Sequence, residues 1–407
     1  MKRNSLLLYL CVFILLTGCG SMEPPTGDSV MTVPATPPIT AEAPAAEADI
    51  SEVDRKESHS TDMIEGNDAD AVSLQEEQGY YYEKLSETEQ EIYAQVYRAL
   101  LNRNEVAVST LSEEELEKMF FCVLNDHPEI FYSNSYVYTI HQRPDERIVK
   151  LTFKGQYLYD EEECAKRMEL IEKEADRILS GIPKDATDFE IIKYIFDTLV
   201  LETEYVADSP DNQNICSVFM NHESTCQGYA KATQYLLMRA GITATFIGGE
   251  VAEGSHAWNL VMSDGAWYYL DTTWGDVDYQ STKENEIDKE VLPINYDYFL
   301  ITSDRLYETH TPSALVPLPA CVATADNYYI HEGLYLTGLD TEILHNIFQT
   351  AYERGDDVVQ FRCANDAVYE QIANYLLEEQ HIFDFVNALE AVPYYDNPQT
   401  DTFCFWL

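Results

Sequence analysis

The stretch Ser224–Ala232, "STCQGYAKA", places a cysteine directly after two small hydroxyl residues and before a run of helix-forming residues. Ser224 or Thr225 can cap a helix, and "CQGYAKATQYLLMRA" predicts one that ends at Gly241. Cys226 then lies at the helix N-terminus, where the dipole favours a thiolate. A cysteine in a helix can otherwise be a core residue, or a disulfide partner in an exported protein.

The runs "SHAWNLVMS" and "AWYYLDTTW" further along the chain are β-rich and are joined by "DG", which predicts a β-hairpin. If Ser263 faces Ala266 across the turn, His256 and Asp271 are diagonal neighbours on one face of the sheet. Their backbones are then about 7–8 Å apart, a gap that an imidazole and a carboxylate can bridge. Trp258 shares this face.

These three polar residues are the ingredients of nucleophilic catalysis. In that interpretation Cys226 attacks a carbonyl as a thiolate, and His256 takes and returns the proton. Asp271 holds the imidazole in one tautomer and stabilises its cation. Each residue alone is more typical of a structural role, but the three on these elements and at this spacing favour a catalytic triad.

The blocks "TCQGYAKA", "SHAWNLV" and "WYYLDTTWGD" resemble the three signature blocks of the transglutaminase-like superfamily. The resemblance covers about residues 185–280 and implies a papain-like α+β fold. In this fold a helix carrying Cys226 packs on an antiparallel sheet carrying His256 and Asp271. The superfamily includes bacterial lipoproteins.

The resemblance also implies an oxyanion hole. Its first donor is the backbone N–H of Cys226, and its second is a side chain upstream, for which Tyr205 is the candidate. Tyr205 can equally be a packed aromatic residue. Asn259 follows the histidine as in the family motif, but the expected register turns it away from the site as supporting structure. Gly228 either leaves room for a substrate or is a tolerated helix glycine.

The N-terminus has the pattern of an export signal. Lys2 and Arg3 precede a short apolar run, which is followed by "LTGC" ending at Cys19. This resembles the lipobox of bacterial lipoproteins and implies lipidation of Cys19. The alternatives are an ordinary signal peptide or a short membrane anchor. We expect a protein anchored by lipid to the bacterial membrane and facing outside the cytoplasm.

Composition divides the chain into five segments. The second is rich in Pro, Ala and acidic residues and nearly free of aromatics, which predicts a disordered tether. The third is an N-terminal, mainly helical α/β region, the fourth the transglutaminase-like domain and the fifth a small α/β module. The expected boundaries are 1–18 for the signal peptide, 19–78, 79–184, 185–312 and 313–407.

The charge and the cysteine content of the chain limit which binding partners, metals and disulfides are expected. The formal net charge of −47 argues against nucleic-acid binding. We expect no cofactor and no metal, because the sequence has no CxxC or Cys/His cluster. Seven cysteines remain after Cys11 and Cys19, so at least one thiol is expected to be free, with Cys226 the candidate. The pairing of the other six stays open: Cys122, Cys164, Cys216, Cys321, Cys363 and Cys404.

The expected function is therefore a cysteine peptidase that acts on peptide or amide bonds through a thioester on Cys226. Its substrates would be proteins or peptides, cell-wall peptides included. Bacterial members of the superfamily are more often proteases or amidases than cross-linkers, so the resemblance favours hydrolysis. The alternatives are a protein cross-linking transglutaminase and a non-catalytic binding or scaffold lipoprotein.

Overall fold

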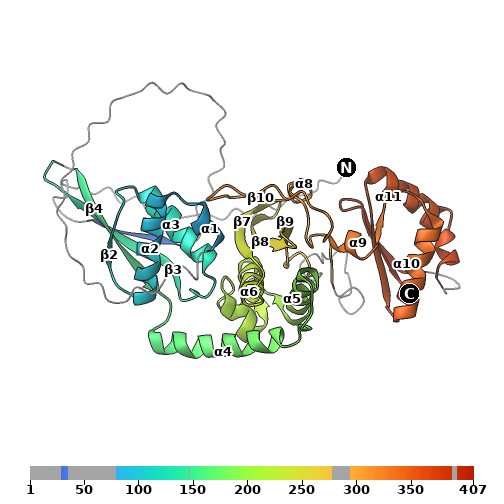
Figure 1. Cartoon of the computed structure of the whole chain (residues 1–407), viewed down its shortest axis with the longest axis horizontal. Helices are drawn as coiled ribbons and strands as arrows, with labels where there is room; N and C mark the ends of the chain where they lie inside the picture. Colours follow the sequence, from blue (N-terminus) through green and yellow to red (C-terminus); the bar gives the residue numbers. More distant parts are fainter. Residues whose placement is uncertain (1–28, 35–78, 146, 277–293, 387–391) are drawn as a thin grey trace, which may run out of the picture.

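The computed structural model describes residues 29–34, 79–145, 147–276, 294–386 and 392–407. Within these residues, three α/β units follow one another along the long axis of the molecule (Figure 1). The expected signal peptide and the lipobox at Cys19 lie outside the described residues, as does most of the expected tether. In the part of the chain that the structure describes, no helix has the length and apolar character needed to cross a bilayer.

The first unit is a four-stranded sheet in the order β1-β3-β4-β2, accompanied by three helices. A capping box of Ser86 and Glu89 begins its second helix. Its two long strands pair antiparallel. The elements are β1 (Ser29–Pro34), α1 (Tyr80–Lys84), α2 (Glu87–Asn102), β2 (Val106–Val108), α3 (Glu113–Asp126), β3 (Ser133–Gln142) and β4 (Ile148–Tyr157).

Strand β1 corrects one sequence-based expectation. Ser29–Pro34, "SVMTVP", lies within the segment predicted to be a disordered tether, yet it pairs antiparallel with β3 along its whole length. The physical reason is local, because two valines and a threonine give these residues a β preference that the surrounding composition lacks. The tether prediction is therefore wrong for residues 29–34.

The central unit pairs helices with a second four-stranded sheet, in the order β10-β7-β8-β9. Helix α6 packs against β7 and β8 on one side and against α5 on the other. The elements are α4 (Glu161–Leu179), α5 (Asp188–Glu202), β5 (Glu204–Tyr205), the π-helical turn Ser217–Asn221, β6 (Glu223–Ser224), α6 (Cys226–Arg239), β7 (Ala244–Val251), β8 (Gly254–Ser263), β9 (Ala266–Leu270), α8 (Ser303–Leu306) and β10 (Thr311–Pro312).

The predicted hairpin is β8–β9, and its register is the expected one, with Ser263 opposite Ala266. Asp264 and Gly265 form the turn with φ of 45° and 75°. Two successive positive φ angles are typical of a type I′ turn, whose twist matches that of the flanking strands. The residues of β8 and β9 therefore lie on the faces of the sheet that the sequence predicted.

The third unit is an α/β module in which helices α10 and α11 alternate with strands β12 and β14, and short strands lie at the two edges of its sheet. Its sheet has the order β11-β12-β14-β13. The elements are α9 (Tyr328–His331), β11 (Tyr335–Leu336), α10 (Thr341–Arg354), β12 (Val358–Cys363), α11 (Asp366–Ala373), the π-helical turn Asn374–Glu378, the 3₁₀ turn His381–Asp384, β13 (Tyr394–Asn397) and β14 (Thr402–Trp406).

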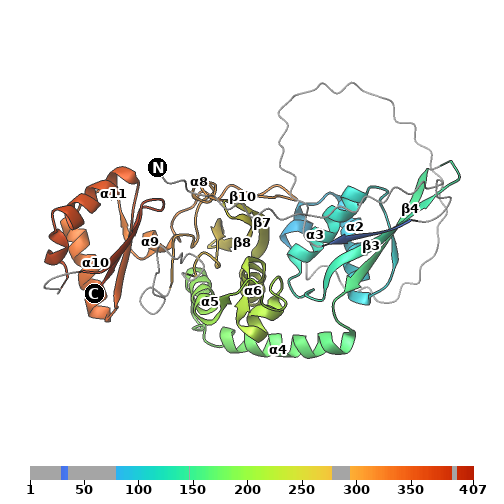
Figure 2. The ribbon, with the colours of Figure 1, turned by 180° about the vertical axis from the view of Figure 1, so that it is seen from behind.

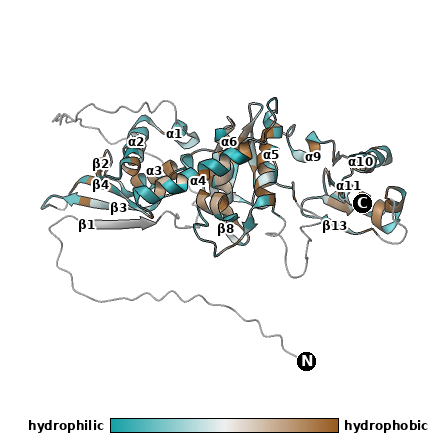
Figure 3. Ribbon diagram, turned by 90° about the horizontal axis from the view of Figure 1, so that it is seen from below, coloured by the Kyte–Doolittle hydropathy of each residue, from teal (hydrophilic) through white to brown (hydrophobic). Residues whose placement is uncertain are grey.

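The first and central units share one hydrophobic core. Tyr80 and Phe120 of the first unit belong to the same buried cluster as Trp258 and Leu260 of β8. Hydrophobic and hydrophilic stretches alternate along α2 and α3, as expected for helices that bury one face (Figure 3). Seen from behind, α4 runs along one side of both units and joins them (Figure 2). The first unit is therefore packed onto the central sheet.

A buried hydrogen bond marks this interface and gives a test of it. Tyr81 donates its hydroxyl proton to the carbonyl oxygen of Phe246 on β7 at 2.8 Å. Tyr81→Phe leaves that carbonyl without its donor and should lower the free energy of unfolding by about 1–3 kcal/mol, measured by urea denaturation. Tyr394→Phe, at a side chain that is 47% exposed, is the control and should have no effect. Equal stabilities for the two variants would contradict this role for the Tyr81 hydroxyl.

Candidate active site

Cys226 is the first residue of α6, as the sequence predicted, and its side chain is partly exposed. The predicted side-chain cap is wrong, because Thr225 occupies the N-cap position but makes no capping hydrogen bond. Its hydroxyl donates instead to the carbonyl oxygen of Asn212 at 2.7 Å. The start of this helix is therefore held by a neighbouring loop and not by its own cap.

The Asn212 carbonyl oxygen is the anchor of the nucleophile's backbone. Besides the Thr225 hydroxyl, it accepts the backbone N–H of Thr225 at 3.2 Å and the hydroxyl of Ser224 at 3.2 Å. Three donors on one oxygen fix the two residues that precede Cys226. The neighbouring Asp211 has a left-handed φ of 60°, which holds the loop in a turn at this point.

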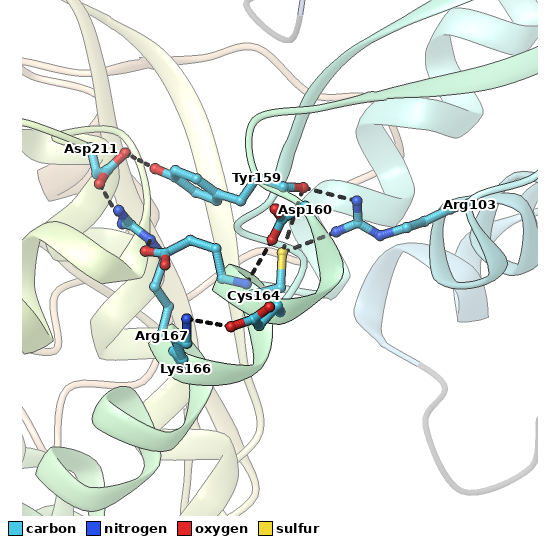
Figure 4. Close-up of polar contacts among 9 residues, drawn as sticks. Arg103, Tyr159, Asp160, Cys164, Lys166, Arg167 and Asp211 are labelled. Carbon is cyan, nitrogen blue, oxygen red and sulfur yellow. Dashed lines mark hydrogen bonds and ion pairs between the residues drawn. The ribbon is translucent and has the colours of Figure 1, made fainter.

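Helix α4 fixes that loop from the other side (Figure 4). Arg167 donates to one carboxylate oxygen of Asp211 at 2.8 Å, and the Tyr159 hydroxyl donates to the other. The Arg167 guanidinium also lies over the Tyr159 ring, 3.9 Å from its centroid, which adds a cation–π attraction. A chain of contacts thus leads from α4 through Asp211 and Asn212 to the residues before Cys226.

Gly228 has a different role from either of the two that the sequence suggested. A Cβ at this position would lie 1.9 Å from Ser224 Oγ and 2.7 Å from Ser217 Oγ. These two hydroxyls hydrogen-bond each other at 2.7 Å in a fully buried position. Gly228 is therefore required by the close approach of the chain that precedes α6, and not by space for a substrate.

His256 and Asp271 meet as the hairpin register predicts. His256 Nε2 lies 2.7 Å from Asp271 Oδ2, and both side chains are almost completely buried. Burial alone would lower the pKa of His256, but the charge of Asp271, its hydrogen bond and the contact with the Cys226 thiol raise it to about 10. Burial would raise the pKa of Asp271, but the charge and hydrogen bond of His256 hold it well below its usual range.

The side chain of Cys226 interacts with the same imidazole that contacts Asp271. Because Nε2 is engaged with the carboxylate, Nδ1 is the ring nitrogen left for the thiol. The structure brings together all three residues that the sequence singled out. A buried imidazolium between a carboxylate and a partly exposed thiol can transfer a proton at that sulfur.

His310 is a fourth member of this cluster that the sequence analysis missed. It lies between α8 and β10, and its Nε2 is 3.1 Å from Asp271 Oδ2. Its Nδ1 lies 2.8 Å from the hydroxyl of the adjacent Thr309. Its hydrogen bond also lowers the pKa of Asp271. No local pattern in "YETHTPS" points to it, because the segment reaches the site only through tertiary packing.

Aromatic rings surround the buried pair. Trp258 and Trp274 lie against the His256 ring, with centroids 6.0 Å and 5.7 Å away. The same two indoles contact His310, at 4.8 Å and 4.5 Å. Trp274 also donates its backbone N–H to Asp271 Oδ1 at 3.1 Å. This arrangement favours a role for the two indoles in shielding the buried pair from water.

The supporting and oxyanion candidates lie as follows. Asn259 is fully buried and donates to the carbonyl oxygens of Ala230 on α6 and Thr245 on β7, at 2.9 Å and 3.4 Å. It therefore ties the helix to the sheet, in the supporting role expected. Tyr205 pairs with Ser224 in the short parallel β5–β6 ladder, two residues before Cys226. This position is next to the nucleophile, and its function as a donor stays a prediction.

Among the residues that the structure describes, His256, Asp271 and His310 are the group with metal-ligand spacing, their donor atoms lying within 4.8 Å of one another. Every one of these atoms already takes part in a hydrogen bond to or from Asp271, and the side chains are 0–1% exposed. A cation would have to displace both hydrogen bonds. We therefore interpret the group as a hydrogen-bond network. All seven described cysteines, Cys226 included, are free thiols.

A family model matches the part of the chain that holds Cys226, His256 and Asp271. The model of the transglutaminase-like superfamily matches residues 175–272. Human kyphoscoliosis peptidase is 26% identical over 155 residues, which are 34% of this chain and 23% of that protein. The chain thus spans less than a quarter of the length of this relative. The expected α+β class, with a cysteine-bearing helix on an antiparallel sheet, is confirmed.

Two solved structures are similar to parts of the chain. A TGase crystal structure has a TM-score of 0.26 and 14% identity, covering 35% of this chain and 46% of that chain. The periplasmic domain of TgpA from Pseudomonas aeruginosa has a TM-score of 0.21 and 14% identity, covering 35% of this chain and 73% of that chain.

The buried histidine predicts a pH dependence of stability. The pKa of His256 in the folded protein, about 10, lies above its ordinary value of 6.5. Its contribution to stability is therefore complete below pH 6.5 and is lost as the pH rises to 10. Urea denaturation at pH 6.5, 8 and 10 should show a steeper loss for the wild type than for His256→Gln. Parallel curves would contradict a raised pKa.

The packing at Gly228 gives a further prediction. Alanine is the better helix former, yet Gly228→Ala should lower the free energy of unfolding by about 1–3 kcal/mol, because its methyl group overlaps Ser224 and Ser217. The matched control is Gly338→Ala, where an added Cβ has no neighbour within 4 Å. Thermal or urea denaturation measures both. A Gly228→Ala variant as stable as the wild type would show that the serine pair is free to move.

Proposed function

Because residues 175–272 belong to the transglutaminase-like superfamily, we propose that this chain is a cysteine-dependent acyl-transfer enzyme, and specifically a peptidase. The observation that carries the proposal is the contact of His256 Nε2 with Asp271 Oδ2 at 2.7 Å, together with the interaction of Cys226 with the same ring. We assign the role of each residue from these contacts. Cys226 is the nucleophile, His256 the acid and base, and Asp271 the group that orients His256.

The first half-reaction forms a thioester. The Cys226 thiolate attacks the carbonyl carbon of a peptide or amide bond, and the carbonyl oxygen becomes an oxyanion. As the first residue of α6, Cys226 has a backbone N–H without an acceptor inside the helix, so it can donate to that oxyanion. Tyr205 is proposed as the second donor. The C–N bond then breaks, and the amine leaves with the proton of the His256 imidazolium.

The second half-reaction resolves the thioester. In hydrolysis, His256 takes a proton from water, the hydroxide attacks the thioester carbon, and the acid leaves as the thiolate of Cys226 is restored. In a cross-linking enzyme a substrate amine replaces the water. The word peptidase in the name of the human relative supports hydrolysis. The proposed substrates are proteins or peptides, including cell-wall peptides.

We further propose that the enzyme acts outside the cytoplasm, anchored through a lipid on Cys19. The support for this is the sequence "LTGC" after a short apolar run with a basic start. A peptide substrate would then be met at the outer face of the membrane.

The proposal can be tested without a substrate, by alkylation of Cys226 over a range of pH in the purified protein. An ordinary thiol has a pKa of about 8.5, so fast labelling at pH 6 requires a thiolate stabilised by the imidazolium. We expect labelling of Cys226 at pH 6 to be at least about tenfold faster than that of the partly exposed Cys164. Peptide mapping by mass spectrometry distinguishes the two sites.

His256→Ala should remove the fast labelling at pH 6 and leave an ordinary thiol titration. If Cys226 instead titrates as an ordinary thiol in the unmodified protein, the nucleophile is not activated and a binding or scaffold role becomes the better explanation. Fast labelling would be followed by peptide libraries with and without added amines. Free acid products indicate a peptidase, and amine incorporation indicates a cross-linking enzyme.

A further inference from the structure

We propose that His310 is a positioning residue for this site: it holds the oxygen of Asp271 that His256 uses and so fixes the orientation of His256 toward Cys226. This inference rests on the proposed function and deepens it. It starts from the unusual sharing of one oxygen, because Asp271 Oδ2 lies 2.7 Å from His256 Nε2 and 3.1 Å from His310 Nε2.

The carboxylate of Asp271 is held from three directions. Oδ2 accepts from the two histidines, and Oδ1 accepts the backbone N–H of Trp274 at 3.1 Å. These donors come from β8, from the segment between α8 and β10, and from the turn after β9. Without His310, Oδ2 would keep His256 as its one partner among these contacts. Asp271 could then orient the imidazole less firmly, because no second donor would hold that oxygen in place.

A relay of hydroxyl groups selects the tautomer of His310. The ionised Asp271 only accepts hydrogen bonds, so His310 Nε2 carries the proton that it shares with the carboxylate. His310 Nδ1 lies 2.8 Å from Thr309 Oγ1, which lies 3.0 Å from the hydroxyl oxygen of Tyr298. The Thr309 hydroxyl has one proton and two acceptors within reach, His310 Nδ1 at 2.8 Å and the Leu306 carbonyl oxygen at 3.5 Å. The shorter contact favours donation to Nδ1, and Tyr298 then donates to Thr309. His310 is then a neutral donor.

Neutrality matters because of the charges around His310. The titratable groups that face it are His256 from β8, Asp271 after β9 and Tyr298 before α8, with Cys226 of α6 beyond His256. The rings of His256 and His310 are 5.5 Å apart. A second cation at this distance would oppose the imidazolium form of His256, whereas a neutral imidazole supplies the hydrogen bond without that repulsion.

The test compares His310→Leu, which removes the donor at similar size, with His310→Gln, whose amide can still donate. The full-length protein is used, and the pH profile of Cys226 alkylation is the measurement. We expect His310→Leu to slow labelling at pH 6 by about tenfold, the scale of one lost hydrogen bond to a charged group. In the His310→Leu variant, the pH at which the alkylation rate falls off on the acid side should rise by roughly one pH unit. The profile of His310→Gln should stay close to that of the wild type.

Two controls separate positioning from general damage to the fold. His127→Gln alters another buried histidine, stacked on Tyr97 in the first unit, and should leave the alkylation profile unchanged. Thr309→Val keeps His310 but removes the hydroxyl that selects its tautomer. It should shift the profile in the same direction as His310→Leu, and it carries the test if that variant does not fold.

The outcomes are distinguishable from those of the proposed function. If Cys226 of the unmodified protein is not labelled quickly at pH 6, the proposed function and this inference are both overturned. If it is labelled quickly, but the profiles of His310→Leu or Thr309→Val coincide with that of the wild type, only the role of His310 is overturned. That role is also overturned if His310→Gln is as slow as His310→Leu, because a retained donor would then make no difference.

Discussion

The contact between His256 and Asp271 is the constraint on which the central unit depends. Both side chains are almost fully removed from water, and an isolated buried carboxylate is costly. The pair is tolerable because hydrogen-bond donors and aromatic rings surround it. Trp258 and Trp274 cover the imidazole, and a backbone N–H satisfies the second carboxylate oxygen. The surroundings thus keep a charged pair reactive where solvent would weaken it.

The nucleophile is positioned by separate means. Cys226 owes its place to a loop whose carbonyl at Asn212 receives three hydrogen bonds, and to a glycine that lets this segment approach α6. The positions of His256 and Asp271 are set by the register of the β8–β9 hairpin. Two independent pieces of the chain therefore have to meet with the precision that nucleophilic catalysis requires. Asn259, which links α6 to β7, is one of the contacts that keep them together.

The sequence predicted the parts of the site that depend on local rules. The "DG" turn fixes the hairpin register, and period-two alternation in the strands then places His256 and Asp271 on one face. It did not predict His310, because residue 310 reaches the cluster after a long connection with no local signal. The Gly228 contacts were missed for the same reason, since they involve a π-helical turn formed by residues 217–221. Strand β1 was missed because average composition hid a short β-favouring stretch.

The contacts of helix α4 restrict how the units of such a protein can be exchanged by recombination during evolution. The salt bridge from Arg167 to Asp211 ties the loop of the nucleophile to a helix that precedes most of the matched superfamily region, residues 175–272. The same helix begins directly beside the sheet of the first unit. Recombination that exchanged only the superfamily segment would separate Asp211 from its partner. We therefore regard the first and central units as one evolutionary unit. Substitutions on the two sides of α4 are expected to be correlated and not independent.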